Sequence, residues 1–271
     1  MKIPKLSTVL FYILALFVAL PFLFPLVWIA LASFKNQAQI VAVPPMWIFE
    51  PTLDNYRKVF LEQEFGRFFL NSAIIAVGST VLSLVLGLPA AYTISRYRQT
   101  TLGVLILLAR LMPGISYLIP WFILFSKLHM VDTYSALIAS HMLVGMPLIV
   151  WIMVNYFDGL PRELEEAAQV DGCTLQQTFM RVVLPLSGPG IITASTLSFL
   201  FSWNNFMFAL VLSADNTKPL PIAIYSFVSY AEVSWGAVMA AAVVIIAPAI
   251  VLTMVFQRYV IKGLTMGAVK G

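Results

Sequence analysis

Long apolar segments dominate the sequence and are separated by shorter polar ones. Six of them are long enough to cross about 30 Å of hydrocarbon at about 1.5 Å per helical residue. The strands of a membrane β-barrel alternate polar and apolar residues over about ten positions, whereas a segment such as Ser79 to Ala91 does not alternate. The pattern therefore predicts an all-α integral membrane protein with six transmembrane helices. Their approximate bounds are 9–32, 68–94, 102–125, 134–157, 190–212 and 235–256.

Composition supports this fold class. Of the 271 residues, 61% are hydrophobic and 10% are charged, and the mean hydropathy is +0.92. A soluble domain carries about 25% charged residues, so this chain does not have enough polar side chains to cover its own surface in water. The composition excludes a cytosolic enzyme, a disordered protein and a disulfide scaffold. We treat residues 1–271 as one transmembrane domain.

Charge and cysteine content exclude several kinds of ligand. The net charge is +4, and no window of five to eight residues is rich in Lys and Arg, so the chain does not resemble a nucleic-acid-binding protein. Cys173 is the only cysteine, which rules out an internal disulfide and a cysteine metal cluster. We expect no metal site.

The first apolar segment is interpreted as a retained helix. Ala30-Leu31-Ala32 imitates the cleavage site of a signal peptide, and Lys2 and Lys5 precede the apolar run. The run from Val9 to Ala32 is much longer than the apolar core of about 7–15 residues in a signal peptide. We therefore expect it to cross the membrane in the mature protein.

The distribution of basic residues predicts the orientation. With the N-terminus inside, the cytoplasmic segments hold nine Lys and Arg residues and the outer segments hold six. Arg96 and Arg98 directly follow the second helix, and Arg258 and Lys262 directly follow the sixth. Because short cytoplasmic connections are enriched in basic residues, both termini are expected in the cytoplasm of a bacterial-type inner (plasma) membrane.

Two outer loops have distinct patterns. Residues 33–67 form a long loop that contains an amphipathic stretch, Leu53 to Phe69, which we expect to lie along the membrane surface. Residues 213–234 begin polar and turn apolar from Leu220 to Val228, which suits a loop or half-helix folded against the bundle.

The one sizeable cytoplasmic loop, 158–189, predicts a helical hairpin. Arg162 to Val170 is expected to form its first helix. Glu163, Glu165 and Glu166 lie in the first turn, where negative charge is favourable at the positive end of the helix dipole.

The turn and the second helix of this hairpin have their own signals. Gly172 follows Asp171 and is suited to the left-handed conformation that ends a helix. Thr174, with Gln177 three residues later, forms a capping box for a second helix, which is expected to end before Pro185. Taken alone, such a hairpin is also what a solvated connector between two membrane helices would look like.

The amino-acid sequence of this loop resembles a known motif. The order and spacing of its residues are similar to the EAA loop of ABC importer membrane subunits, between the predicted fourth and fifth helices. The matching residues are Glu166-Ala167-Ala168, Asp171-Gly172, Phe179, Leu184-Pro185 and Pro189.

Other segments resemble the carbohydrate-uptake subfamily of these permeases, typified by the smaller membrane subunit of maltose transporters. They are Asp54-Asn55-Tyr56, Trp203-Asn204-Asn205-Phe206 and the C-terminal segment from Gln257-Arg258-Tyr259 to Gly271.

The resemblance implies that the hairpin docks into a groove on a cytoplasmic ATPase. Ala167 and Ala168 would allow close approach, Glu166 would pair with a basic residue, and Leu175 and Phe179 would pack the hairpin onto the bundle. The residues implied in coupling are Glu165, Glu166, Ala167, Ala168, Asp171, Gly172, Phe179, Leu184 and Pro185.

The C-terminal tail has two readings. The resemblance implies that Gly267, Val269, Lys270 and Gly271 reach into the ATPase interface. A polar end after the last membrane helix is, however, usually just a frayed terminus.

The chain itself contains no ATP-binding motif. A P-loop requires Gly-Lys-Ser/Thr, and none of the 14 glycines is followed by Lys. We expect a non-catalytic subunit with no cofactor of its own, and ATP and Mg²⁺ bound by the partner ATPase. The resemblance implies a lipid-embedded complex with a homologous second permease, two ATPase subunits and an extracytoplasmic solute-binding protein.

Polar residues within the predicted helices are candidates for the transport pathway. Trp203, Asn204 and Asn205 combine an aromatic face with amides, which is the chemistry that holds sugars, but amides also link helices to one another. Arg110 is expected to line the pathway or to snorkel toward the interface. His141 is expected to have a hydrogen-bonded packing role.

These patterns favour the permease subunit of an ATP-driven importer for a sugar or oligosaccharide. A stand-alone secondary transporter or channel is the first alternative, but all 12 acidic residues lie outside the six predicted helices, which disfavours ion coupling. A permease for another solute, such as a glycerol phosphodiester or a polyol, is the second. The sequence does not select the sugar.

Overall fold

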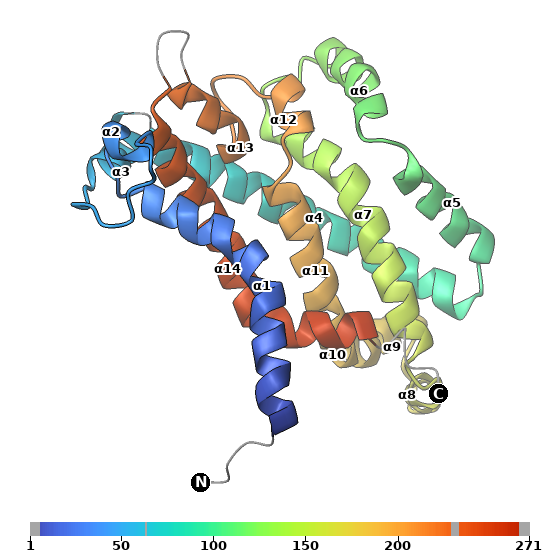
Figure 1. Ribbon diagram of the computed structural model, residues 1–271. Helices are drawn as coiled ribbons and strands as arrows, with labels where there is room; N and C mark the ends of the chain where they lie inside the picture. Colours follow the sequence, from blue (N-terminus) through green and yellow to red (C-terminus); the bar gives the residue numbers. More distant parts are fainter. Residues whose placement is uncertain (1–5, 63, 229–232, 266–271) are drawn as a thin grey trace. The chain divides into compact units, whose positions relative to one another are not determined.

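The computed structural model describes residues 6–62, 64–228 and 233–265 (Figure 1). Apart from an isolated antiparallel bridge between Val228 and Val233, these residues form helices and their connections. The chain divides into two compact units. The first comprises Met1–Gly66 and Ala223–Ala247, and the second comprises Arg67–Ile222 and Pro248–Gly271.

Four helices of the described chain are long and apolar enough to cross a membrane: Leu10–Ala32 within α1, Phe65–Arg96 (α4), Tyr134–Asp158 (α7) and Trp235–Tyr259 within α14. A fifth candidate is a bent pair of helices, Leu175–Leu186 and Gly188–Trp203. The all-α membrane class is confirmed. Four of the expected segments, 9–32, 68–94, 134–157 and 235–256, coincide with these long helices.

The expected continuous helix over 102–125 is instead two helices. α5 covers Thr100–Leu111 and α6 covers Ile115–Lys127. Met112 between them has extended backbone, with φ −66° and ψ 131°. The physical reason is Pro113, because the residue before a proline is pushed out of the helical region by its ring.

The expected helix over 190–212 is also divided. α11 covers Gly188–Trp203 and α12 covers Met207–Leu212. The side chain of Asn205 accepts a hydrogen bond from the backbone N–H of Phe208 at 3.2 Å. Asparagine competes with the helical ladder in this way, so it starts a new helix more readily than it continues an old one.

Within the second unit, α7 packs against α5, α11 and α12. Figure 1 shows α6 and α12 at one end of α7 and the short helices α8, α9 and α10 at the other. Two apolar clusters hold the helices together. One includes Ala91, Ile149, Met153 and Phe179 near the short helices, and the other contains Phe125, Leu137 and Phe208.

The loop after α6 is fastened to the loop after α12 by Asp132. Its carboxylate accepts hydrogen bonds from the backbone N–H groups of Ala214, Asn216 and Thr217, at 2.9, 3.1 and 3.0 Å. It also accepts from the Asn216 amide at 2.8 Å and the Thr217 hydroxyl at 2.7 Å. Burial would raise the pKa of Asp132, but these hydrogen bonds outweigh it and lower the pKa to about 2.

The first unit contains α1 (Leu6–Ala32), α2 (Gln37–Ile40), α3 (Asp54–Arg57), the π-helical η1 (Lys58–Glu62), η3 (Ile224–Phe227) and the start of α14 (Trp235–Thr265). Asn55 is buried in it and donates to the backbone carbonyls of Ser33 and Lys35, both at 2.8 Å. A Cβ at Gly236 would overlap the Asn55 side chain. Gly236 therefore permits the close approach of α14 to this residue.

The two predicted outer loops differ in how far they match the expected structure. The amphipathic stretch Leu53 to Phe69 is not one helix along a surface, because α3 and η1 end at Glu62 and Phe65 already begins α4. Glu64, with φ +50°, lies between them outside any helix. The apolar part of residues 213–234 forms the short helices α13 (Leu220–Ala223) and η3, in agreement with the expected half-helix.

Candidate functional site

Residues 158–189 form the predicted helical hairpin. α8 (Glu163–Val170) is its first helix, with three glutamates in the first turn. Gly172 has φ +89°, and a Cβ there would meet no atom within 4 Å. A glycine is therefore required here because of the backbone conformation, and not because a side chain would clash with a neighbour.

The second helix of the hairpin begins at the predicted capping box. The Gln177 N–H donates to the Thr174 hydroxyl at 3.3 Å, and the Thr174 N–H donates to the Gln177 side chain at 3.0 Å. α9 (Leu175–Thr178), the π-helical η2 (Phe179–Val183) and α10 (Leu184–Leu186) follow without interruption.

The prediction that this helix ends before Pro185 is wrong. Pro185 lies inside α10, and the chain turns only at Ser187. The π-helical turn explains this, because the Leu184 N–H bonds the carbonyl of Phe179, five residues earlier. The wider turn accommodates a proline whose missing N–H would interrupt an α-helical ladder.

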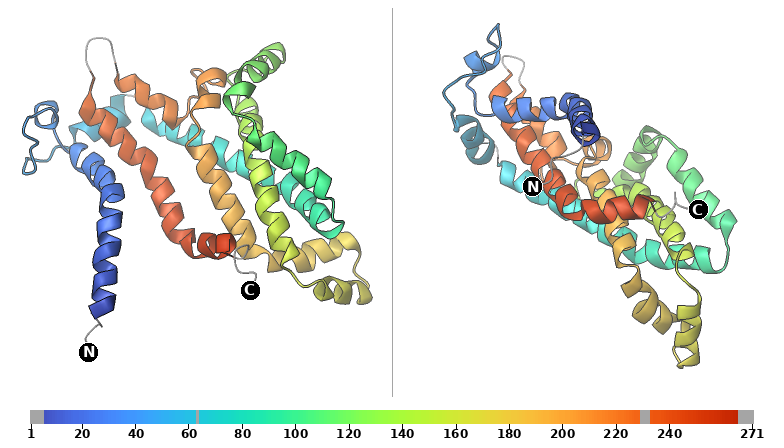
Figure 2. Two further views of the ribbon diagram at one scale, coloured as in Figure 1. Left: turned by 45° about the vertical axis from the view of Figure 1, so that its right-hand side comes forward. Right: turned by 60° about the horizontal axis from the view of Figure 1, so that its bottom comes forward.

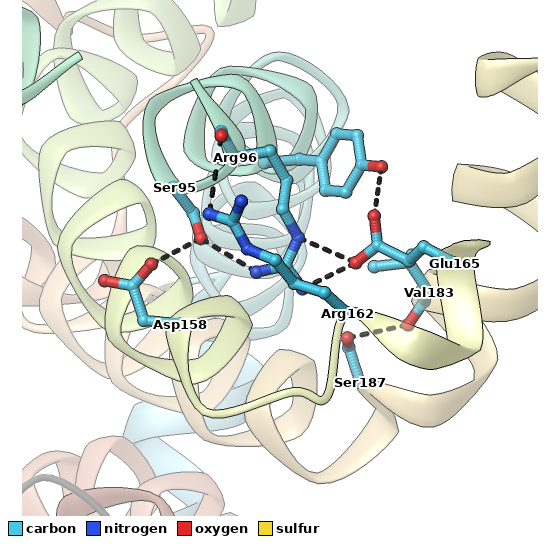
Figure 3. Close-up of polar contacts among 8 residues, drawn as sticks. Ser95, Arg96, Asp158, Arg162, Glu165, Val183 and Ser187 are labelled. Carbon is cyan, nitrogen blue, oxygen red and sulfur yellow. Dashed lines mark hydrogen bonds and ion pairs between the residues drawn. The ribbon is translucent and has the colours of Figure 1, made fainter. Parts of the chain in front are cut away.

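A buried ion pair attaches the hairpin to α4. The Arg96 guanidinium contacts Oε1 of Glu165 through Nε at 2.7 Å and through Nη2 at 2.5 Å, and each side chain is 9% exposed (Figure 3). The Tyr92 hydroxyl donates to the other carboxylate oxygen at 2.6 Å. Both oxygens of Glu165 are thus satisfied inside the chain.

The ends of α4 and α7 are linked beside this pair. The Ser95 hydroxyl donates to the Asp158 carboxylate at 2.5 Å, and Arg96 Nη1 lies 3.4 Å from the same hydroxyl. Arg162 reaches the Arg96 backbone carbonyl at 3.5 Å. Figure 3 shows Ser95, Arg96 and Arg162 gathered between Asp158 and Glu165.

An aromatic cluster forms the rest of the attachment. The rings of Tyr92 and Phe179 have centroids 4.9 Å apart, and those of Tyr92 and Phe157 are 5.8 Å apart. Phe179 is 9% exposed, and Leu184 packs against the same cluster. The structure thus brings Phe179 to the position expected for packing the hairpin onto the bundle.

Much of the remaining surface of the hairpin is exposed. Leu175 is 54% exposed, so the expectation that it packs onto the bundle is wrong. Ala168 is buried. The other exposed residues of the hairpin include Leu164, Glu166, Ala167, Val170, Asp171, Met180 and Pro185.

Tyr92, Arg96 and Asp158 hold the hairpin but were missed by sequence reasoning. Arg96 was counted only as a basic residue that indicates orientation. To predict the ion pair, one would need to know which of Glu163, Glu165 and Glu166 is buried against α4. A single sequence does not show this.

Some predicted residues lie outside the described part of the chain. This holds for Gly267, Val269, Lys270 and Gly271, and for the side chain of Arg110, whose backbone lies in α5.

The predicted pathway residues surround the break between α11 and α12. Trp203 is 2% exposed and packs against Phe69 and Phe199, with ring centroids 5.5 and 5.6 Å away. Asn204 is exposed, and its amide donates to the Leu200 carbonyl at 2.8 Å. Of the three residues, Asn205 lines a cavity.

That cavity has a volume of about 340 Å³. It lies where the break between α5 and α6 faces α7, α11 and α12. Tyr117 lines it, with its hydroxyl donating to the Ala109 carbonyl at 2.7 Å. Its lining residues are Ala109, Met112, Gly114, Tyr117, Leu143, Val144, Phe201, Asn205, Met207 and Phe208.

His141 lies outside this lining and is buried in the helix packing. Its Nδ1 is 2.7 Å from the Ser202 hydroxyl, and Ser79 donates to the same hydroxyl at 3.0 Å. The three side chains join α4, α7 and α11, which fits the expected packing role.

The long apolar helices and the attached hairpin define a multi-pass helical membrane protein. The profile of the family described as binding-protein-dependent transport system inner membrane component matches residues 83–266, which include the hairpin. The chain belongs to this family.

Curated relatives cover nearly the whole chain. The trehalose/maltose transport system permease protein MalG of Thermococcus litoralis is 34% identical over 100% of both chains. The trehalose transport system permease protein SugB of Mycobacterium tuberculosis is 36% identical over 92% of this chain and 93% of its own. The sulfoquinovosyl glycerol transport system permease protein SmoH of Agrobacterium fabrum is 34% identical over 92% and 89%.

Solved structures show the same fold. A chain of a bacterial ABC transporter involved in the import of the acidic polysaccharide alginate superposes with a TM-score of 0.79 at 23% identity, over 96% of this chain and 99% of its own. A chain of the MetNI methionine ABC transporter in an inward-facing conformation gives 0.58 at 19% identity, over 73% and 94%.

Proposed function

We propose that this chain is the membrane-spanning permease subunit of an ATP-driven importer that translocates a sugar or oligosaccharide. An extracytoplasmic binding protein delivers the solute, and a homologous second permease completes the pathway. Two ATPase subunits bind ATP and Mg²⁺, and this chain is non-catalytic. Family membership and the relatives that serve trehalose, maltose and other glycoside transport systems support the proposal.

The observation that carries the proposal is a hairpin that is firmly attached to the bundle and still has exposed residues. The hairpin is fixed to α4 by the Arg96–Glu165 pair and the aromatic cluster. Glu166, Ala167 and Leu175 of the same hairpin are exposed. A surface with exposed apolar and small residues on a rigid support is suited to a protein partner.

The proposed topology has six crossings and cytoplasmic termini, with all 271 residues in one permease domain. α5 and α6 together form the third crossing, because their 12 and 13 residues extend about 37 Å at 1.5 Å per residue. α11 and α12 together form the fifth. Arg96 at the end of α4 and Arg98 after it support a cytoplasmic hairpin.

Coupling then proceeds through the hairpin. Glu166, Ala167 and Asp171 enter a groove on the ATPase, while Glu165, Ala168, Phe179 and Leu184 connect the hairpin to the bundle. ATP binding draws the two ATPases together, and the attached helices change from inward to outward access. ATP achieves this by binding one state more tightly than the other. The C-terminal tail, Gly267 to Gly271, is proposed as a second ATPase contact.

The cavity at the two helix breaks is the proposed solute position in this subunit. Its volume of about 340 Å³ is within the range of small-molecule sites. Asn205 uses Oδ1 to cap α12, and the described residues include no partner for its Nδ2. That amide is therefore suited to donate to a sugar hydroxyl, while the buried Trp203 packs at the end of α11.

A charge reversal tests the proposal. In liposomes containing the co-purified complex, we expect Glu166→Lys to lower ATP-dependent sugar uptake roughly ten-fold or more, because it opposes a basic partner surface. Gly172→Pro should also abolish uptake, because proline does not adopt the φ of +89° found there. Glu163→Lys, on the same helix turn, is the matched control and should retain uptake.

The same liposomes separate the competing functions. Uptake by this chain alone, without ATPase and binding protein, would show a secondary transporter or channel and contradict the proposal. Uptake at the wild-type level by Glu166→Lys and Gly172→Pro would refute hairpin docking. Thermal-shift screening of the binding protein against sugars, glycerol phosphodiesters and polyols identifies the solute class.

A further inference from the structure

A second cavity, of about 550 Å³, lies in the second unit and has no role in the proposed transport cycle. Three helices form it: the C-terminal end of α4, the first turns of α5 and the C-terminal half of α7. Residues 94–107 supply one wall and residues 147–162 the other.

The lining changes from polar to apolar along the cavity. Ser95, Arg98, Thr100, Asp158 and Arg162 gather at the end where α7 leaves its apolar stretch. Apolar side chains follow deeper along the helices, among them Val104, Leu107, Val150, Trp151 and Val154.

The length of the apolar part matches one leaflet of a bilayer. From Asp158 back to Pro147, α7 contributes 11 residue steps, or about 16 Å at 1.5 Å per residue. Half of a hydrocarbon core of about 30 Å is about 15 Å. The cavity thus extends from the membrane interface to about the bilayer centre.

The polar end favours an anion. Asp158 is engaged by the Ser95 hydroxyl, and the hydrogen bond described for Arg162 goes to a backbone carbonyl at 3.5 Å. Arg98 is exposed, and no ion pair to it is described among the residues placed in the structure. Two guanidinium groups beside one occupied carboxylate leave an excess of positive charge, and guanidinium groups bind phosphate strongly.

We propose that this cavity binds an anionic phospholipid, with its phosphate at Arg98 and Arg162 and one acyl chain along Val104, Leu107 and Trp151. The two guanidinium groups at the polar end and the apolar lining of one-leaflet length favour a lipid over a partner helix. The site depends on the membrane position of α7 and not on the solute or on hairpin docking.

Native mass spectrometry of the full chain, purified with the subunits that accompany it, tests the site. We expect one phosphatidylglycerol to remain bound where phosphatidylcholine does not. The double variant Arg98→Gln/Arg162→Gln should bind phosphatidylglycerol about 30-fold more weakly, from about five-fold per basic residue at an anionic lipid surface. Arg181→Gln, an exposed arginine of the hairpin outside the cavity, is the matched control.

A second variant tests the acyl-chain part independently. Gly103 lines the cavity, and a Cβ there makes only an ordinary contact of 3.4 Å with Ile94. Gly103→Leu should therefore fill the cavity without unfolding the protein and should displace the lipid. Competition by glycerol phosphate alone should be weak, because it has no acyl chain.

Three results would overturn the inference. They are equal retention of phosphatidylglycerol and phosphatidylcholine, equal loss in the double variant and in Arg181→Gln, and undiminished binding in Gly103→Leu. Displacement by glycerol phosphate at the lipid's own concentration would instead identify a free-phosphate site. Loss of the lipid when the second permease joins the complex would identify a subunit interface.

Discussion

Glu165 and Glu166 are neighbours in the sequence but have different surroundings. Glu165 is 7% exposed against Arg96 and Tyr92, whereas Glu166 is exposed. Neighbouring helix positions point about 100° apart, so a short helix lying on a bundle buries one and exposes the other. The sequence predicted that the pair begins a helix, but only the packing of α8 on α4 decides which of the two faces the bundle.

Arg96 is expected to be essential for the stability of this attachment. Arg96→Met leaves the buried Glu165 carboxylate without its cation, which costs about 3–5 kcal/mol for a buried pair. The apparent midpoint of thermal unfolding in detergent should fall, and uptake should fall with it.

The control and the compensating variant sharpen this test. Arg181→Met, at an exposed position of the hairpin, should shift stability by less than about 0.5 kcal/mol. Arg96→Met/Glu165→Leu should recover most of the loss, because an apolar pair replaces the buried charges. An unchanged midpoint in Arg96→Met would contradict the structural role of the pair.

Asp132 is expected to make stability depend on pH. Its pKa is lowered to about 2, so the folded state favours the ionised carboxylate. The stabilisation is fully present above about pH 4, the ordinary range of an aspartate, and is lost as the pH falls toward 2. Asp132→Asn should cost about 1–3 kcal/mol near neutral pH, because it removes a charged acceptor of several hydrogen bonds.

The difference between wild type and Asp132→Asn isolates this one group from the other carboxylates. Thermal midpoints measured from pH 6 to pH 2.5 should converge at the acidic end. A difference that stays constant over this range would show that the charge of Asp132 does not contribute.

At the scale of elements, the hairpin was predictable and the broken helices were not. Gly172, Thr174 and Gln177 act within four or five residues of chain, so their roles follow from local chemistry. Apolar periodicity, in contrast, continues through Met112 and Asn205 and does not reveal that helices end there. A proline such as Pro113 indicates a kink, but the size of the interruption depends on the surrounding helices.

The crossing of α7 and α11 depends on a glycine. A Cβ at Gly190 would lie 2.5 Å from Cδ2 and 2.6 Å from Cγ of the Tyr156 ring. Small residues let membrane helices approach closely, so Gly190→Ala should cost about 1–3 kcal/mol through overpacking.

Gly188→Ala provides the matched control for this prediction. It lies in the same helix, and a Cβ there would meet no atom within 4 Å. Alanine is the better helix former, so this variant should be neutral or slightly stabilising. Equal thermal midpoints for the two variants would argue against a close crossing at Gly190.

At the scale of the whole molecule, composition and apolar length were sufficient for the fold class. The family was predictable from the sequence motif of the hairpin, because the spacing of that motif reflects a local structure that the surrounding helices do not alter. Within the candidate site, the packing of Phe179 was predictable, and the partners of the buried Glu165 were not. Tyr92, Arg96 and Asp158 reach it from two long helices, and single-sequence reasoning had no means of pairing residues 63 to 73 positions apart.

The bend at Ser187 determines what a pull on the hairpin does to the bundle. The helix Leu175–Leu186 and α11 meet at 77° (Figure 2). Only about a fifth of any displacement along the hairpin axis is therefore directed along α11, by the cosine of that angle. In the proposed coupling, the remainder would move the start of α11 sideways, so that the helix tilts more than it shifts along its own axis.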